Sequence, residues 1–142
     1  MFKMICNNEN DQLYCLRICA DSTADDLQPV AQVVHALLGI PVTIRSKNYK
    51  GLRMERGVVV EKEYTGPILE EVLRTNTLIR KVPSEGTYKG KSVVVVPIRT
   101  HEGDVIAAIG VVDLVAAMDI LYMFREYPGI IDEVEEARSR MK

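Results

Sequence analysis

The pattern of apolar and polar positions first becomes periodic near residue 25, where it predicts a helix. Gly39 and Pro41 mark its end. Pro29 is tolerated only in the first turn, where amide hydrogens have no intrahelical acceptor, so we expect Asp25 or Asp26 as the N-cap. The apolar side chains recur three and four residues apart, at Leu27, Val30, Ala31, Val34, Leu37 and Leu38.

After this helix the period changes to two, which predicts β-strands. Residues 42–45 and 52–55 alternate between apolar and polar positions, and a tight turn at Arg56-Gly57 leads into residues 58–61, so these three segments predict a three-stranded meander. Residues 78–82 predict a further strand. Two strongly apolar runs, 92–98 and 105–112, flank a polar turn and predict a hairpin at the centre of the sheet.

The remaining apolar positions predict three more helices. One follows Thr65-Gly66-Pro67, with Thr65 as N-cap and proline in the first turn, and ends near Asn76. The other two, 114–127 and 130–141, are separated by Pro128-Gly129.

The order of these elements predicts an α/β protein of the α+β type. Strands outnumber the helices between them, which favours an antiparallel sheet of about five to six strands flanked by helices. The chain has 142 residues and no linker-like composition, so we expect a single domain over 1–142. It comprises a poorly readable segment (1–20), a core (21–113) and C-terminal helices (114–142).

Composition and charge narrow the possible partners. Apolar residues make up 47% and charged residues 27% of the chain, and the net charge is −2. These values predict a folded domain with no global attraction for nucleic acid or an anionic membrane surface. The most apolar helical segment, Leu114 to Phe124, contains Asp119 and is about half the ~20 residues of a bilayer span.

The cysteines and the start of the chain predict a cytoplasmic location. Cys6, Cys15 and Cys19 are odd in number, unlike the paired cysteines of small secreted domains, and the N-terminal apolar stretch is too short for a signal peptide. A metal site would need a fourth ligand at a suitable spacing, so buried small apolar side chains are the favoured role for these thiols. We assign them no function.

Two resemblances support this fold. Residues 86–113, GTYKGKSVVVVPIRTHEGDVIAAIGVVD, resemble the PAS/GAF group of sensor domains, which implies an antiparallel sheet flanked by helices. Residues 40–51 (IPVTIRSKNYKG) and 64–73 (YTGPILEEVL) are similar to a small family of unknown function from methanogenic archaea, over about residues 21–113. These resemblances imply a stand-alone sensor-like module and supply no catalytic residues.

The meander is the most basic part of the chain and the first candidate binding site. Five basic residues and one acidic residue lie between Arg45 and Arg56. Arg45 and Arg53 oppose the apolar positions of their strands, so they can share one sheet face and bind a carboxylate or phosphate. The alternative is that they protect a sheet edge. The candidate ligand-binding residues are Arg45, Lys47, Arg53, Tyr64 and Gly66.

For the other candidate residues, a structural role explains the sequence at least as well as a functional role does. The helix start at Gly66 can bind an anion or be simply capped, and Asp113 can face a pocket or cap the next helix. Ala107, Ala108 and Gly110 allow a helix or a ligand to approach the sheet closely. His35 and His101 are expected at the surface or its boundary.

The favoured function is a sensor-like regulatory module that binds a small anionic ligand. The alternative is a ligand-free homodimerisation or protein interaction module, with the homodimer formed through Leu114 to Phe124, where apolar residues occupy two helix faces. No nucleophile elbow, histidine pair, kinase motif or dinucleotide fingerprint is present, so no catalytic or metal-binding residue is predicted and an enzyme is disfavoured. The cofactor is unknown.

Overall fold

The computed structural model describes residues 15–113, 121–123, 125–126 and 129–140. The chain divides into two compact units, Met1–Val112 and Asp113–Lys142. Within the described residues, no helix is both long and apolar enough to cross a membrane.

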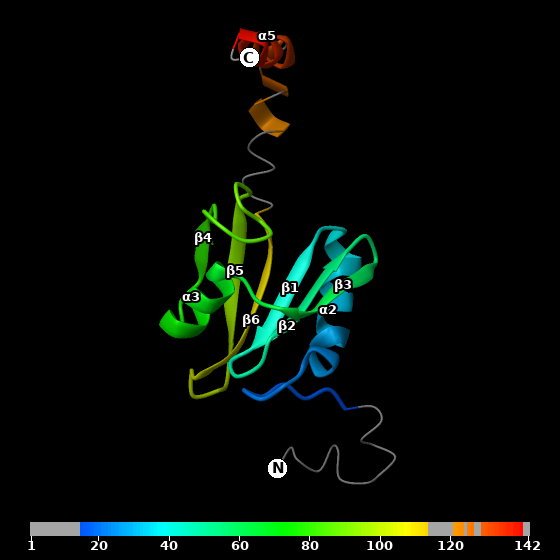
Figure 1. Cartoon of the computed structure of the whole chain (residues 1–142), viewed down its shortest axis with the longest axis vertical. Coiled ribbons are helices and arrows are strands. Elements are labelled where there is room, and N and C mark those ends of the chain that lie inside the picture. Colours follow the sequence, from blue (N-terminus) through cyan, green and yellow to red (C-terminus); the bar gives the residue numbers. More distant parts are fainter. Residues whose placement is uncertain (1–14, 114–120, 124, 127–128, 141–142) are drawn as a thin grey trace. The chain divides into compact units, whose positions relative to one another are not determined.

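The first unit is built on a six-stranded antiparallel sheet (Figure 1). The sheet confirms the predicted α+β class and antiparallel pairing. Its strands follow the order β3-β2-β1-β6-β5-β4. Their bounds are β1 Val42–Ser46, β2 Gly51–Glu55, β3 Val58–Tyr64, β4 Ile79–Lys81, β5 Val93–Arg99 and β6 Val105–Val112.

The centre of the sheet differs from the prediction. The expected central hairpin, β5 with β6, forms, but the two middle strands are β1 and β6. β1 pairs with β6 in a register that runs from Val42 opposite Val111 to Ser46 opposite Ala107. This pairing joins the meander to the hairpin and moves β5 to the second place from the edge.

Helix α2 (Ala24–Leu38) begins earlier than predicted. Thr23 is the N-cap: its side chain accepts a hydrogen bond from Asp26 N, and the Asp26 carboxylate accepts one from Thr23 N. Pro29 therefore lies inside the helix and not in the first turn, which removes one intrahelical hydrogen bond. Gly39 ends the helix in the left-handed conformation, as predicted, with φ +69°.

The face of α2 that packs on the sheet also differs from the prediction. The buried positions are Ala24, Leu27, Ala31 and His35, while Leu37 is 79% exposed. The expected surface position of His35 is thus wrong. Its Nδ1 lies 2.7 Å from Ile40 O, and its Nε2 accepts from Gly57 N at 2.8 Å, so a neutral ring protonated at Nδ1 satisfies both bonds.

Helix α3 (Pro67–Thr75) starts at the predicted proline, but its N-cap is Gly66, which makes no side-chain cap bond. Thr65, the expected cap, instead accepts a hydrogen bond from Arg45 Nη1 at 2.9 Å. Asn76 ends α3 in the left-handed conformation. Helix α3 is therefore positioned partly by a side chain from β1.

The sheet has a hydrophobic core on each face. Helix α2 packs on β1 and β2, and α3 packs on β5 and β6. The core under α2 contains Ala24, Leu27, Ala31, Val42, Ile44, Leu52 and Met54. The core under α3 contains Tyr64, Ile68, Leu69, Val72, Leu73, Val93, Val95, Val105 and Ala108. Because the two helices cover different strands, the α3 face of β1 and β2 is left for other groups.

The described part of the second unit is helical at 121–123 and 125–126 and contains helix α5 (Ile130–Arg140). No residue of α5 is buried, and Leu121, Tyr122 and Met123 are exposed. Most of the predicted dimer segment, residues 114–120 and 124, lies outside the described residues, as do residues 1–14 with Cys6.

Candidate functional site

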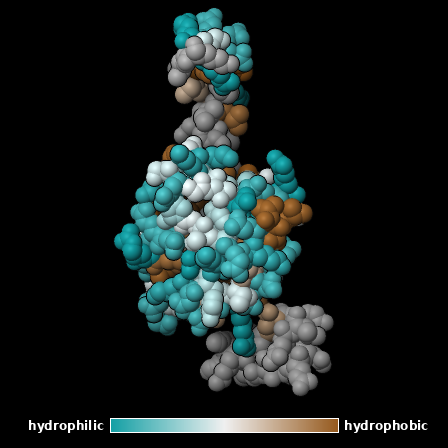
Figure 2. Space-filling view, viewed as in Figure 1, coloured by the Kyte–Doolittle hydropathy of each residue, from teal (hydrophilic) through white to brown (hydrophobic). Residues whose placement is uncertain are grey.

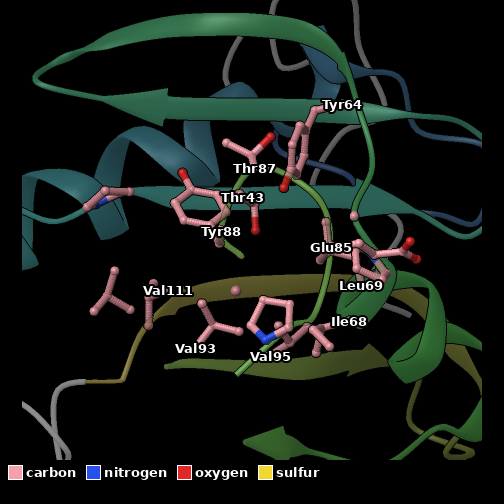
Figure 3. A pocket seen from close by; sticks show the side chains of 16 residues that line it. Thr43, Tyr64, Ile68, Leu69, Glu85, Thr87, Tyr88, Val93, Val95 and Val111 are labelled. Atoms are coloured by element: carbon pink, nitrogen blue, oxygen red, sulfur yellow. The ribbon is translucent and has the colours of Figure 1, made fainter. Parts of the chain in front are cut away.

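A small pocket lies in the first unit, on the α3 face of the sheet (Figure 3). Its volume is about 30 Å³, which is room for about two water molecules. Strands β1, β5 and β6, the start of α3 and the segment between β4 and β5 all contribute to it. The lining residues are Pro41, Thr43, Tyr64, Gly66, Pro67, Ile68, Leu69, Pro83, Glu85, Thr87, Tyr88, Val93, Val95, Gly110, Val111 and Val112.

The walls of this pocket differ in chemistry. In Figure 3, Tyr64, Thr87 and Tyr88 lie along one side, and Ile68, Val93 and Val95 lie across from them. The valines come from β5 and belong to the core under α3. The pocket is thus mainly apolar, with hydroxyl groups gathered on one side.

Gly110 of β6 creates part of the space. A Cβ atom at this position would lie 2.8 Å from Val95 Cγ2 and 3.0 Å from Thr43 Oγ1. Any side chain here would fill the gap between β1 and β5. The small residue predicted to allow close approach of a helix or a ligand therefore borders the pocket, while Ala108 packs in the core under α3.

The segment between β4 and β5, residues 82–92, forms one wall of the pocket, and we call it the cover loop. It is held by its own backbone: Gly90 N donates to Pro83 O at 3.1 Å, and Lys89 N donates to Gly86 O at 3.2 Å. Gly86 and Gly90 both have positive φ, which other residues rarely adopt. The loop is thus a compact unit that contributes Pro83, Glu85, Thr87 and Tyr88 to the pocket.

Tyr88 attaches the cover loop to the sheet. Its hydroxyl donates to Glu55 Oε2 on β2 at 2.8 Å, and its ring packs against the core under α3. Glu55 also accepts from Arg53 Nη1 at 2.7 Å. Arg53 in turn contacts Glu61 at 3.5 Å and lies over the Tyr64 ring, 5.9 Å from its centroid.

The ionisation of this cluster follows from its contacts. The hydrogen bond from Tyr88 holds the pKa of Glu55 below its ordinary value, and Arg53 acts in the same direction. Burial, and then the bond to Glu55, raises the pKa of Tyr88. Burial also raises the pKa of Tyr64, against a hydrogen bond with Thr87 that lowers it. At neutral pH the pair is a carboxylate that accepts from a neutral phenol.

Arg45 occupies the predicted sheet face but binds the protein itself. Its Nε donates to Ser46 O at 2.8 Å, Nη1 to Thr65 Oγ1 at 2.9 Å and Nη2 to Lys47 O at 3.1 Å. Nη1 is also 3.5 Å from Glu70 Oε1. The side chain is only 10% exposed. Arg45 thus connects β1 to the loop before α3.

The other predicted site residues are divided between pocket and surface. Tyr64 and Gly66 line the pocket, whereas Arg45 and Arg53 hold protein groups and Lys47 is exposed. The alternative that the arginines protect a sheet edge is wrong, because the edges are β3 and β4. Arg45 lies on a central strand, and Arg53 lies one strand in from the edge.

The cysteine interpretation also needs correction. Cys15 is disulfide-bonded, and Cys19 is an exposed free thiol, so neither is a buried apolar side chain. No group of three histidine, cysteine or acidic side chains suited to a metal ion occurs in the part of the chain that the structure describes. His101 is exposed in its turn, as expected, and Asp113 is buried directly after β6.

Several residues of the site are not evident from the sequence. Thr43, Glu55 and Tyr88 come from three separate segments, and only the folded sheet brings them to one face. Tyr88 lies in a glycine-rich segment that the sequence identifies only as a loop. The one local signal is Gly110, a glycine inside a strand pattern.

Comparison with known proteins places this chain in an archaeal family. Residues 34–115 match the family DUF2111, described as an uncharacterized protein conserved in archaea. This match covers more than half of the chain, and the chain belongs to this family.

A methanogen protein is also similar. The uncharacterized protein MJ0405 of Methanocaldococcus jannaschii is 42% identical over 105 residues, which are 72% of this chain and 79% of that protein. The predicted resemblance to an archaeal family of unknown function is thereby confirmed. No solved structure shows significant similarity to this chain.

Proposed function

We propose that this domain is a sensor-like regulatory module that binds a small ligand in the pocket beneath the cover loop. The observation that carries the proposal is the gap at Gly110. It is bordered by Tyr64 and Tyr88 and closed by the cover loop. A mainly apolar pocket with a few convergent polar groups is the usual form of a small-molecule site. The resemblance of residues 86–113 to PAS/GAF sensor domains supports the same role.

The lining favours a small, uncharged and mainly apolar ligand over the anion that the basic meander predicted. Within the described part of the chain, no lysine or arginine borders the pocket, and Glu85 is the charged residue in its lining. Arg45 and Arg53 already bind protein oxygens. Thr43, Tyr64 and Thr87 can exchange hydrogen bonds with one hydroxyl or carbonyl group of a ligand.

Binding requires the cover loop to move. Pockets for small molecules commonly have volumes of about 300–1,000 Å³, far more than this cavity. The loop carries its own backbone hydrogen bonds, so it can move as a unit when contacts such as those of Tyr88 with Glu55 and of Thr87 with Tyr64 are broken. Ligand binding would then be read out as a change in the position of the cover loop.

A substitution on β5 tests the site directly. Val95 borders the pocket, and Val95→Ile adds one methylene group to it. A thermal-shift screen against small alcohols, ketones, esters and other neutral metabolites should find a compound that raises the Tm of the wild-type protein. Val95→Ile should raise the apparent Kd of that compound at least tenfold, because the added carbon occupies space that the ligand needs.

The matched control is Val94→Ile. Val94 neighbours Val95 on the same strand, points to the other face and does not border the pocket. It should leave the ligand response unchanged. A compound that stabilises both variants equally binds elsewhere and would contradict the proposed site, and a screen without any stabilising compound would contradict the proposed function.

A further inference from the structure

Strand β5 has an apolar face on the side of the sheet away from α3. Val93 and Val95 belong to the core under α3. Val94 and Val96 alternate with them, so they point to the opposite side of the sheet, where both are only partly buried. Among the described helices, α3 packs on β5 and β6, and α2 packs on β1 and β2. These helices therefore leave this face of β5 uncovered.

Strand β6 continues the apolar face towards α2. Val111 lies opposite Val94, and Ile109 lies opposite Val96. Ile109 and Val111 also border the core under α2. The apolar surface therefore runs without a break from α2 to β5.

The edge strand β4 extends the same face. Lys81 binds Glu71 of α3 at 2.8 Å, so it points to the α3 side. Leu78 and Val82 lie an odd number of residues from Lys81 and point to the opposite side. They are 51% and 54% exposed. We call the surface formed by Leu78, Val82, Val94, Val96, Ile109 and Val111 the outer sheet face.

The outer sheet face is wide enough for one helix. In Figure 1, α2 lies at the β1–β3 side of the sheet, away from β4 and β5. Strand β5 is two strands away from β1, about 10 Å, and helices that pack side by side are about 8–10 Å apart. Along the sheet, the 7 residues of β5 extend for about 23 Å. A second helix would therefore lie over β5, next to α2.

Helix α5 has an apolar side with no buried residue. Ile131 is 56% exposed and Val134 is 45% exposed, and Ile130 and Ala137 lie on the same side. Its 11 residues span about 16 Å, which is shorter than β5. A helix of this length is marginal in water and depends on the packing of its apolar side. Helix α5 thus has the size and the surface that the outer sheet face accommodates.

We infer that α5 of a second copy of this chain docks on the outer sheet face, and that two chains exchange these helices across a two-fold axis. A stable interface buries about 800 Å² from each partner, more than one short helix supplies. In the exchange each chain contributes one helix and receives one, so the two contacts form together and the contact area doubles. The outer sheet face and the pocket lie on opposite sides of the sheet, so the dimer does not depend on a ligand.

Sedimentation of the full chain tests this dimer. The wild-type protein should have the mass of two chains at micromolar concentration. Leu78→Asp and Val134→Asp should each weaken dimerisation at least tenfold, because each places a charge in an apolar contact that occurs twice. Both side chains are about half exposed, so the fold should tolerate the change, which circular dichroism and thermal unfolding check.

Two controls place the same charge elsewhere. Val58→Asp changes a side chain that is 56% exposed at the start of β3, the other edge of the sheet. Figure 2 shows an apolar patch on the side of the first unit where Figure 1 shows this strand. Ser139→Asp lies five residues after Val134, about 140° around α5. Both controls should keep the mass of two chains.

Disulfide trapping establishes that the helix comes from the second copy. With Cys19→Ser in every chain, a Val82→Cys chain is mixed with a Val134→Cys chain under mild oxidation. The exchange predicts a covalent pair of chains that a reductant separates, and neither variant alone should give it. A monomeric wild-type chain, an unchanged dimer in Leu78→Asp or Val134→Asp, an equal loss in either control, or a mixture without the covalent pair would each overturn the inference.

Discussion

Glu55 is the residue at which sheet and cover loop meet. It accepts hydrogen bonds from Tyr88 and Arg53, and its side chain is 29% exposed. The hydrogen bond from Tyr88, which requires the folded loop, is the main reason that the pKa of Glu55 is lowered. The ionised form is therefore favoured by folding.

This shift predicts acid sensitivity. Because the pKa of Glu55 is lower in the folded than in the unfolded protein, its contribution to stability is complete above the unfolded pKa, about 4.3, and is lost as the pH falls through the folded pKa. Urea unfolding from pH 6 to pH 3 should show a loss of about 1 kcal/mol or less from this group, since it is partly solvated.

Glu55→Gln should remove that part of the pH dependence, because the amide does not titrate. Glu102→Gln, in the exposed turn between β5 and β6, serves as the control and should keep the wild-type slope. Equal slopes in all three proteins would mean that Glu55 gains nothing from Tyr88 on folding.

At the scale of elements, Asn76 joins α3 to the β5–β6 hairpin. Its φ is +54°, in the left-handed region. Its Nδ2 donates to Gly103 O at 2.9 Å, and its Oδ1 accepts from Arg99 Nε at 2.7 Å. The backbone of Asn76 therefore ends the helix, and its side chain ties the helix to both the strand and the turn of the hairpin.

Replacement of Asn76 should separate these two roles. Asn76→Gly keeps the left-handed cap but loses both side-chain bonds, at about 1–2 kcal/mol. Asn76→Ala loses the bonds and also strains the backbone, so it should cost roughly 1 kcal/mol more. Urea unfolding measures both values. A less stable glycine variant would show that backbone strain is not important at this position.

At the scale of the whole molecule, the first unit contains both hydrophobic cores. Among the residues that the structure describes, the buried members of the two cores lie between Ala24 and Ala108. The described residues of α5 add none. Both cores are thus built from described residues of the first unit.

The first unit should therefore fold alone. A chain that ends at Asp113 is expected to unfold cooperatively, with a Tm within about 5 °C of the full chain, which corresponds to roughly 1 kcal/mol. Thermal circular dichroism and calorimetry provide the measurement. Loss of the cooperative transition would mean that residues 114–142 are needed for the fold.

The sequence by itself determined the elements whose signals are local. Period-two alternation located the meander, β-branched runs located the hairpin, and Gly66-Pro67 located the start of α3, because each pattern reflects the geometry of a short segment. It also showed that Arg45 and Arg53 oppose the apolar side of their strands. Local patterns extend no further than the segment that carries them.

The tertiary structure decided which segments meet. The pairing of β1 with β6 made these strands central, and the packing of α2 buried His35 and exposed Leu37. The same assembly placed protein oxygens where they accept hydrogen bonds from Arg45, and it brought the Tyr88 hydroxyl to Glu55. These contacts join residues far apart in the chain, and their existence depends on strand order and helix placement, which hydrophobic periodicity does not encode.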